Sequence, residues 1–418
     1  MTHSLEVQVH EPDEAAELVR LSFEEVAGFV GGIQSMHTGI AGRAFRLTGP
    51  AAAPVRFLHD RAAGAVYGGL AGATRGLGRA AGAALARRPG WGGRVVSSTP
   101  QGAALVGVLS GLVGDALEKR RSALIEPMSV RVGGRPVAID RGELARAFPN
   151  AGPRVVVFLH GLMETDWSWR RGSEPYGARL ERDLGLTPVY VRYNTGRHVS
   201  HNGSSFAQLV EQFVAEWPVD VSEVALVGHS MGGLVARSAA HKASGDEMQW
   251  VRLVRHVVSI GTPHMGAPLE QFVHYASAGL AALPETRPVS QFLRRRSAGI
   301  RDLRRGSLVD EDWADCDPDA LRAAACKEIP LLDGATHCFV TATITRSPRH
   351  PVGRLIGDFL VLQASGSGRS RTRRIAFDED YGFHVGGAHH FALLNHPAVY
   401  DKLRDWLDSR PRELPAPA

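Results

Sequence analysis

Cysteine and lysine are both scarce in this sequence of 418 residues. The three cysteines, Cys316, Cys326 and Cys338, are an odd number without metal-ligand spacing, which argues against a disulfide framework and a zinc site. We therefore expect reduced, structural thiols in a cytoplasmic protein. Because lysine is so rare, arginine supplies nearly all of the basic charge. The net charge of +5 is too small to indicate nucleic acid as a partner.

Long apolar runs are missing as well. The first twenty residues carry five acidic side chains and no apolar core, which argues against a secretory signal. The longest apolar stretch, residues 103–113, is too short to span a bilayer. The hydrophobic content of 44% and the charged content of 22% are ordinary for a globular protein with an ample core.

The most informative stretch is a serine between two glycines, Gly228-His229-Ser230-Met231-Gly232. An apolar run at residues 224–227 precedes it, and apolar residues at helical spacing follow it. This context predicts a buried parallel strand, a tight turn and a helix, the arrangement of a nucleophile elbow. With 47 glycines in the chain, the pentapeptide alone arises by chance with a probability of roughly one in three. The flanking strand and helix therefore carry the assignment.

The first 125 residues predict an N-terminal helical extension. Residues 12–48, 55–88 and 104–120 each show helical periodicity. In the second segment glycine recurs every fourth residue from Gly64 to Gly76, a spacing that lets another helix approach closely. Arginine predominates in this region. A peripheral contact with an anionic membrane or lipid surface therefore competes with a helical appendage on the catalytic domain.

From residue 126 onward the pattern changes. Residues 126–150 predict a β-hairpin and a linker, because apolar residues alternate on both sides of Gly133-Gly134. In residues 151–412 strands and helices alternate, which predicts a mostly parallel α/β sheet covered by helices on both faces. Residues 264–335 exceed what one crossover needs and are interpreted as a lid or cap insertion. Residues 413–418 are a tail.

A serine nucleophile requires a base and a group that orients the base. In this architecture the order along the chain is serine, acid and histidine, each at the carboxyl end of a strand. Among the histidines near the end of the chain, His390 precedes the last predicted helix and is our candidate base. His389 is its immediate rival, and His396 beside Pro397 is interpreted as structural.

The acid is expected between the serine and the base. Asp358 follows the strand predicted over residues 338–342, at the right point before His390, and is our candidate. Asp333 comes before that strand and is therefore on the wrong side. The three acids at positions 378–380 remain an alternative, although such a cluster is more typical of a solvated loop.

Two backbone amides are expected to form the oxyanion hole. One is the amide of Met231, at the start of the helix after the serine. The other is the amide of Leu162, in the segment His160-Gly161-Leu162 that directly follows the first main strand. His160 is interpreted as a supporting residue. Residues 192–196, at the end of the next strand, are predicted to line or support the pocket.

Together these motifs resemble the α/β-hydrolase superfamily, and within it the bacterial lipase/esterase and GPI inositol-deacylase-like branch. The resemblance covers roughly residues 150–410 and includes Gly261-Thr262-Pro263-His264-Met265-Gly266, which is typical of that branch where its lid begins. The acid and histidine motifs of the branch match Asp358 and His390, although a glycine commonly follows the acid where this chain has Phe359. The resemblance implies hydrolysis of a small-molecule ester or lipid through an acyl-enzyme, with no metal or organic cofactor.

Two other functions fit the same residues. In an acyltransferase, an alcohol instead of water would resolve the acyl-enzyme. A binding or scaffold protein would keep the hydrolase shell without the activity. The intact serine, histidine, acid and glycine positions argue against this last interpretation.

Overall fold

The computed structural model of the chain describes residues 14–47, 53–86, 96–122, 124–125, 127–172, 174–267, 296–316, 326–370 and 373–408. These residues fall into two compact units. The smaller unit extends to Thr99 and includes Arg120–Leu124, and the larger unit holds Pro100–Lys119 and most of the chain after Ile125. The predicted lid lies partly outside the described residues, which do not include 268–295 and 317–325.

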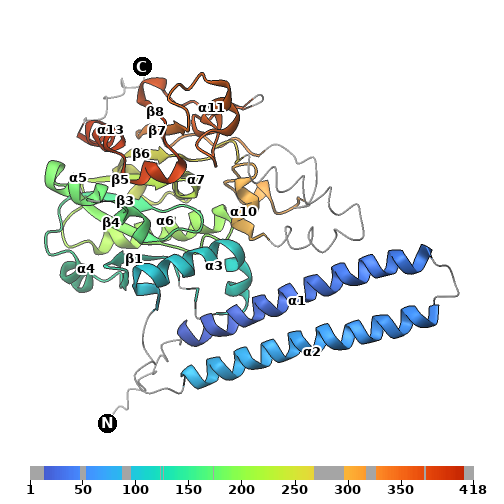
Figure 1. The fold of residues 1–418 in the computed structure, drawn as a ribbon. Coiled ribbons are helices and arrows are strands. Elements are labelled where there is room, and N and C mark those ends of the chain that lie inside the picture. Colours follow the sequence, from blue (N-terminus) through green and yellow to red (C-terminus); the bar gives the residue numbers. More distant parts are fainter. Residues whose placement is uncertain are drawn as a thin grey trace, which may run out of the picture. The chain divides into compact units, whose positions relative to one another are not determined.

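Two long helices, α1 (Glu14–Leu47) and α2 (Ala53–Ala86), make up most of the smaller unit and lie side by side (Figure 1). The start of α1 contacts the end of α2, so the pair is antiparallel. A Cβ atom added at Gly78 would lie 2.5 Å from the Cβ of Phe23, and one at Gly82 would lie 3.0 Å from the carbonyl oxygen of Ala16. Glycine therefore allows the close approach at these two positions. A short helix, η2 (Val96–Ser98), completes the unit.

The predicted glycine series does not form this contact. Around Gly64, Gly68, Gly72 and Gly76, no atom of the described residues lies within 4 Å of an added Cβ. The buried positions of α2 include Ala63 and Ala71, so the series falls on a neighbouring face of the helix. The predicted helices are present, and within the described residues their close approach falls at Gly78 and Gly82.

The larger unit is built on an eight-stranded sheet with the order β2-β1-β4-β3-β5-β6-β7-β8. Its strands are β1 (Ser129–Val132), β2 (Arg135–Val137), β3 (Arg154–Leu159), β4 (Thr187–Arg192), β5 (Glu223–His229), β6 (Val254–Ile260), β7 (Thr336–Thr343) and β8 (Gly382–Gly386). β1 and β2 form the predicted hairpin, and β1 joins the sheet by pairing antiparallel with β4. The strands from β4 to β8 pair in parallel, which confirms the predicted mostly parallel sheet.

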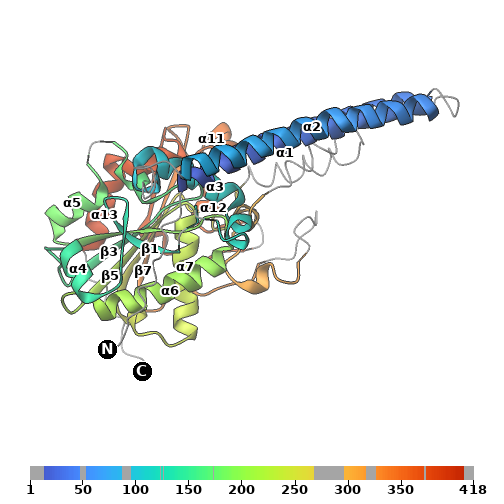
Figure 2. The same cartoon turned by 90° about the horizontal axis from the view of Figure 1, so that it is seen from below.

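Helices cover both faces of the sheet because its central strands are apolar on both sides. In β3, Val155, Val157 and Leu159 face one core, and Val156 and Phe158 face the other. The first core contains side chains of α6 (Val199–Glu216) and α7 (Met231–Gly245), which lie side by side in Figure 2. The second contains side chains of α5 (Tyr176–Leu184) and α13 (Pro397–Asp408). Each fully buried side chain of this size stabilises the fold by about 1.5–3 kcal/mol, so the two layers are strongly specified.

Helix α3 (Pro100–Lys119) belongs to the larger unit, although the sequence places it in the N-terminal extension. The Ser110 hydroxyl donates to Oδ1 of Asn194 at 2.9 Å, and Nδ2 of Asn194 donates to the Gly114 carbonyl at 3.0 Å. With its 20 residues, α3 is long and apolar enough to cross a membrane, whereas the apolar run at residues 103–113 alone is too short. The core helices of soluble proteins can have the same length and composition. The hydrogen bonds to Asn194 hold α3 against the rest of the larger unit, to which it belongs.

The remaining elements are short and connect the strands. They are α4 (Arg141–Ala147), η3 (Asp166–Arg170), η4 (Gln249–Leu253), α10 (Ala298–Leu303), η5 (Asp310–Asp312), α11 (Pro351–Ile356), α12 (Gln363–Gly366), η6 (Glu379–Tyr381) and η7 (His390–Asn395). α4 forms within the segment that the sequence assigned to a linker. Its start is capped by the Asp140 carboxylate, which accepts hydrogen bonds from the amides of Gly142 and Glu143.

Candidate active site

Ser230 stands at the turn between β5 and α7 in a strained backbone conformation. Its φ of 52° and ψ of −120° cost of order 1–3 kcal/mol for a residue with a side chain. The flanking glycines permit the turn, because a Cβ at Gly228 would lie 2.4 Å from the Gly233 nitrogen and one at Gly232 would lie 2.3 Å from the Leu159 carbonyl oxygen. The predicted sequence of strand, tight turn and helix is therefore present at this serine.

His390 and Asp358 form a buried pair. Nδ1 of His390 lies 2.8 Å from Oδ2 of Asp358, and the two side chains are only 2% and 1% exposed. The backbone amide of His390 also donates to the carbonyl of Asp358, at 3.0 Å. The other carboxylate oxygen accepts from the amides of Leu360 and Val361 at 3.0 and 2.8 Å. These contacts hold the carboxylate in one orientation toward the imidazole.

The turn after Asp358 has a backbone conformation that is unfavourable for the residue it contains. Phe359 adopts a φ of 84°, a left-handed conformation that favours glycine. Its side chain is 59% exposed, so it gains little from burial in return. A glycine, which the family resemblance leads one to expect at this position, would adopt this turn without strain. The chain keeps the turn with phenylalanine in that position.

The rival residues lie in other surroundings. His389 is exposed at the start of η7. His384 lies 3.0 Å from the hydroxyl of Thr341. Among the rival acids, Asp378 accepts a hydrogen bond from the amide of Asp380 at an exposed position. Of the acids and histidines that the sequence offers as candidates, Asp358 and His390 are the two that hydrogen-bond to each other next to the serine turn.

Gly261 links the serine turn to the base. It follows β6, whose last residue, Ile260, accepts a hydrogen bond from the Ser230 amide at 2.8 Å. A Cβ added at Gly261 would lie 3.2 Å from Cε1 of His390. The ring of His229, directly before the serine, has its centroid 4.8 Å from that of His390. The serine turn, His390 and Asp358 therefore lie together at the carboxyl edge of the parallel sheet, where α/β folds place their sites.

The loop after β3 lies directly on the serine turn. The amide of Glu164 donates to the Gly161 carbonyl at 3.2 Å and closes this loop, and a Cβ at Gly161 would lie 3.0 Å from the Cβ of Ser230. In the part of the chain that the structure describes, neither the Leu162 amide nor the Met231 amide donates to a protein acceptor. Two uncommitted amide donors beside a nucleophile are what an oxyanion hole requires.

The residues at the end of β4 support this loop. The Tyr193 amide donates to Nε2 of His160 at 3.3 Å, and Nδ1 of His160 lies 3.0 Å from the Gly161 carbonyl oxygen. A neutral ring with its proton on Nδ1 satisfies both contacts. Burial lowers the pKa of His160 to about 4, which favours that neutral form. Beside it, Arg192 and Asp166 form a buried ion pair at 2.6 Å.

Glu164 is the site residue that sequence analysis missed. Its carboxylate lies 2.9 Å from Nδ1 of His229, immediately beside Ser230, and accepts a hydrogen bond from the Gly161 amide at 2.7 Å. In the sequence Glu164 is a single acid in a loop, without periodicity or a motif of its own. Its partner is 65 positions away, so the pairing becomes visible only in the folded chain.

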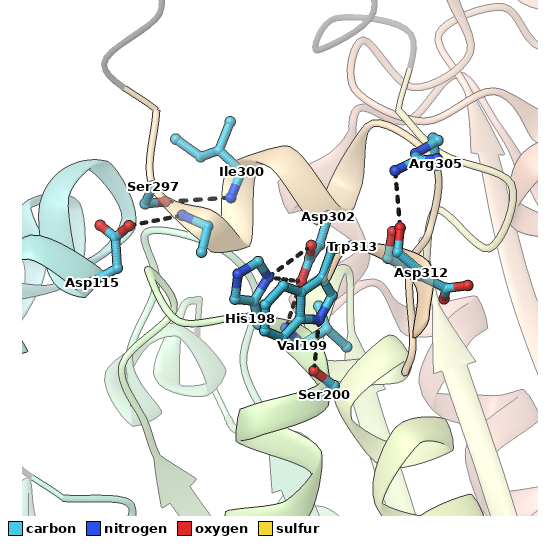
Figure 3. Close-up of polar contacts among 12 residues, drawn as sticks. Asp115, His198, Val199, Ser200, Ser297, Ile300, Asp302, Arg305, Asp312 and Trp313 are labelled. Atoms are coloured by element: carbon cyan, nitrogen blue, oxygen red, sulfur yellow. Dashed lines mark hydrogen bonds and ion pairs between the residues drawn. The ribbon is translucent and has the colours of Figure 1, made fainter. Parts of the chain in front are cut away.

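The described part of the predicted lid includes α10, close to the start of α7. A Cβ at Gly299 would lie 3.1 Å from Cε of Met231. Figure 3 shows how α10 is attached: the carboxylate of Asp302 lies 3.1 Å from Nδ1 of His198, whose ring stacks on Trp313 at a centroid distance of 3.6 Å. These contacts hold α10 against the start of α6.

Comparison with known proteins yields related sequences. The family model of the PGAP1-like alpha/beta domain matches residues 199–317, which include α6, the elbow and α10. A triacylglycerol lipase of Pseudarthrobacter phenanthrenivorans is 31% identical over 122 residues, which are 28% of this chain and 35% of that protein. A triacylglycerol lipase of Burkholderia plantarii is also 31% identical over 122 residues, 28% of this chain and 32% of that protein. These matches support a relation of this part of the chain to α/β hydrolases of the lipase and esterase type.

The match spans about a third of the length of these curated relatives. Among solved structures, the lipase BlEst2 of Bacillus licheniformis in its propeptide form aligns with this chain at a TM-score of 0.42 and 16% identity, over 64% of this chain and 53% of that chain. EstA of Clostridium botulinum aligns at a TM-score of 0.37 and 13% identity, over 72% of this chain and 95% of that chain. Among the described residues, no group of three or more His, Cys, Asp or Glu side chains is placed to hold a metal ion.

Proposed function

We propose that this protein hydrolyses carboxylic esters through an acyl-enzyme, with Ser230 as the nucleophile, His390 as the base and Asp358 as the group that orients the base. The observation that supports this most strongly is the buried pair of His390 and Asp358, 2.8 Å apart, next to the strained serine turn. A carboxylate on Nδ1 holds the ring proton there. The lone pair of Nε2 is then available to take the proton of the serine hydroxyl.

The reaction follows in two balanced steps. Ser230 Oγ attacks the ester carbonyl carbon while His390 takes the hydroxyl proton, and the tetrahedral intermediate expels the alcohol, which leaves with that proton. Water then attacks the acyl-enzyme, again giving a proton to His390, and the acid is released as Ser230 regains its hydrogen. The carboxylate of Asp358 stabilises the imidazolium in both steps.

The negative charge of each intermediate falls on the former carbonyl oxygen. We assign the Leu162 and Met231 amides as its donors, because neither donates to an acceptor among the described residues and both flank the serine turn. The positive end of α7, a helix of 15 residues that begins at Met231, adds to the same stabilisation. In other enzymes one such donor contributes about 2.7–4 kcal/mol to transition-state binding.

A small-molecule ester or lipid is the proposed substrate class, because the named relatives are triacylglycerol lipases. An ester chain-length profile of the full chain and of a chain lacking residues 1–99 tests this. The truncation ends before α3, since that helix belongs to the larger unit. A preference for long acyl chains that is lost on truncation would support a lipid-surface contact through the first two helices. Equal profiles would contradict that contact.

Ser230→Ala tests the assignment itself. Turnover of p-nitrophenyl butyrate is expected to fall by about 10⁴-fold or more, and a fluorophosphonate is expected to label the wild-type protein at Ser230 alone. Ser238→Ala is the matched control, because this hydroxyl lies in the same helix but donates to the Leu308 carbonyl at 2.6 Å. Wild-type turnover by Ser230→Ala, or labelling at another residue, would defeat the proposal.

A further inference from the structure

A second acid and imidazole pair is buried directly behind the serine turn. Nδ1 of His229 lies 2.9 Å from Oε2 of Glu164, and the side chains are 0% and 3% exposed. Burial alone would raise the pKa of Glu164, but the charge and hydrogen bond of His229 and the bond from the Gly161 amide lower this pKa to about 2. The contacts of Glu164 therefore favour its carboxylate form. The proposed hydrolysis uses neither residue directly.

The same carboxylate oxygen also holds the oxyanion loop. Oε2 of Glu164 accepts the Gly161 amide at 2.7 Å, one residue before the proposed donor Leu162. An added Cβ at Gly161 would lie 2.9 Å from Oε2 of Glu164, 3.0 Å from Cβ of Ser230 and 3.2 Å from Nδ1 of His229. One oxygen atom thus connects the loop to the residue that precedes the nucleophile. Hydrogen bonds to a buried carboxylate are roughly twice as strong as neutral ones.

The far side of the His229 ring reaches the base. Nε2 of His229 lies 3.4 Å from the backbone carbonyl oxygen of His390, and the two rings are 4.8 Å apart between centroids. The chain of contacts therefore runs from Gly161 through Glu164 and His229 to His390. Its members come from the loop after β3, the last residue of β5 and the segment after β8, which meet at the carboxyl edge of the sheet.

We propose that Glu164 is a positioning residue that, through His229, fixes the oxyanion loop against the serine turn and the base. This inference rests on the proposed ester hydrolysis. The Leu162 amide has to meet the carbonyl oxygen at the moment when Ser230 Oγ meets the carbonyl carbon. A small displacement of the loop weakens the bond to the transition state much more than the binding of the neutral ester.

Glu164→Gln separates positioning from folding. The side chain keeps its size, but its single oxygen is neutral. Its hydrogen bonds with the Gly161 backbone amide and with the protonated Nδ1 of His229 are therefore weaker than those of the carboxylate. We expect kcat for p-nitrophenyl butyrate to fall about 10- to 100-fold with KM changed less than about twofold, because loss of a whole oxyanion donor costs about 10²- to 10³-fold. The acylation rate with a fluorophosphonate is expected to fall by the same factor.

Glu223→Gln is the matched control. Glu223 is the first residue of β5, the strand that ends at His229. It lies 3.7 Å from Nδ1 of His256, at the amino ends of the strands and so away from the serine turn. This variant is expected to lose thermal stability while its kcat stays within about twofold of the wild-type value. If Glu164→Gln lowers only the melting temperature and leaves kcat unchanged, Glu164 is structural and the inference is overturned.

Two variants at position 229 keep the test decisive if Glu164→Gln does not fold. His229→Gln retains an N–H donor toward Glu164 and is expected to keep kcat within about fivefold, whereas His229→Leu removes the donor and is expected to lose about 10- to 100-fold. Equal kcat values for the two variants would overturn the inference. A wild-type protein without ester turnover or fluorophosphonate labelling would instead defeat the proposed function.

Discussion

Replacing Asp358 with asparagine tests how far catalysis depends on the position of one proton. The carboxylate accepts three hydrogen bonds. Oδ2 accepts one from Nδ1 of His390 at 2.8 Å, and Oδ1 accepts one from each of the amides of Leu360 and Val361, at 3.0 and 2.8 Å. Asparagine offers only one oxygen and one NH₂ group. Because two backbone amides need the oxygen, the NH₂ group is left facing the imidazole.

His390 then has to accept a hydrogen bond at Nδ1, which moves its ring proton to Nε2. That nitrogen can no longer take the proton of Ser230. The analogous change in a serine protease lowers kcat about 10⁴-fold, which corresponds to about 5.5 kcal/mol of activation free energy. Folding should suffer much less, because the side chain keeps its volume and its bonds to both amides. We expect a loss of about 1–3 kcal/mol in the free energy of unfolding.

Steady-state turnover of p-nitrophenyl butyrate and the second-order rate of fluorophosphonate labelling both report the change. Asp378→Asn is the control, since Asp378 is a rival acid in the sequence but only accepts the Asp380 amide at 3.0 Å on the surface. It should behave as wild type. A kcat of Asp358→Asn within about tenfold of the wild-type value, or an equal loss in the control, would refute the tautomer argument.

Two further predictions concern stability. Phe359→Gly should raise the free energy of unfolding by up to about 1 kcal/mol in urea titrations without changing kcat, because φ is 84° and the side chain is 59% exposed; a loss of stability would contradict this. Burial lowers the pKa of His160 and of His337 to about 4 from 6.5. Because the unfolded chain binds these protons near pH 6.5 and the folded chain only near pH 4, stability is greatest above pH 6.5. It should fall by about 1.4 kcal/mol per pH unit for each histidine as the pH drops through that window. In His337→Gln, the slope of the unfolding free energy against pH, measured between pH 7 and 4.5, should decrease by the amount that corresponds to one proton. An unchanged slope would count against the assignment.

Several elements could be predicted from local sequence because their cause is local. Parallel strands buried on both faces have to be continuous apolar runs, so β3, β5, β6 and β7 were recognisable from composition alone. The serine turn was recognisable because a strained turn between a strand and a helix needs glycine on both sides. β8 was not predicted. In its segment, Gly-Phe-His-Val-Gly, only Phe383 and Val385 carry an apolar signal.

Other features depended on partners far along the chain. Helical periodicity predicts α6 from about Phe206, but the helix begins at Val199. Residues 199–205 have poor helix propensity, and they are helical because tertiary contacts bury Val199, Asn202 and Gly203. Similarly, the sequence places α3 in the N-terminal extension. Its hydrogen bonds to Asn194, 80 or more positions away, assign it to the larger unit.

The sequence by itself determined the alternation of the central strands and helices and the candidate nucleophile, acid and base, because each of these depends on a pattern of neighbouring residues. Only the tertiary structure decided which side chains share a hydrogen bond. His390 meets Asp358 across 32 positions, and His229 meets Glu164 across 65. These pairings arise because parallel strands bring their carboxyl ends to one edge of the sheet. A buried carboxylate there is stable only when the fold supplies its donors.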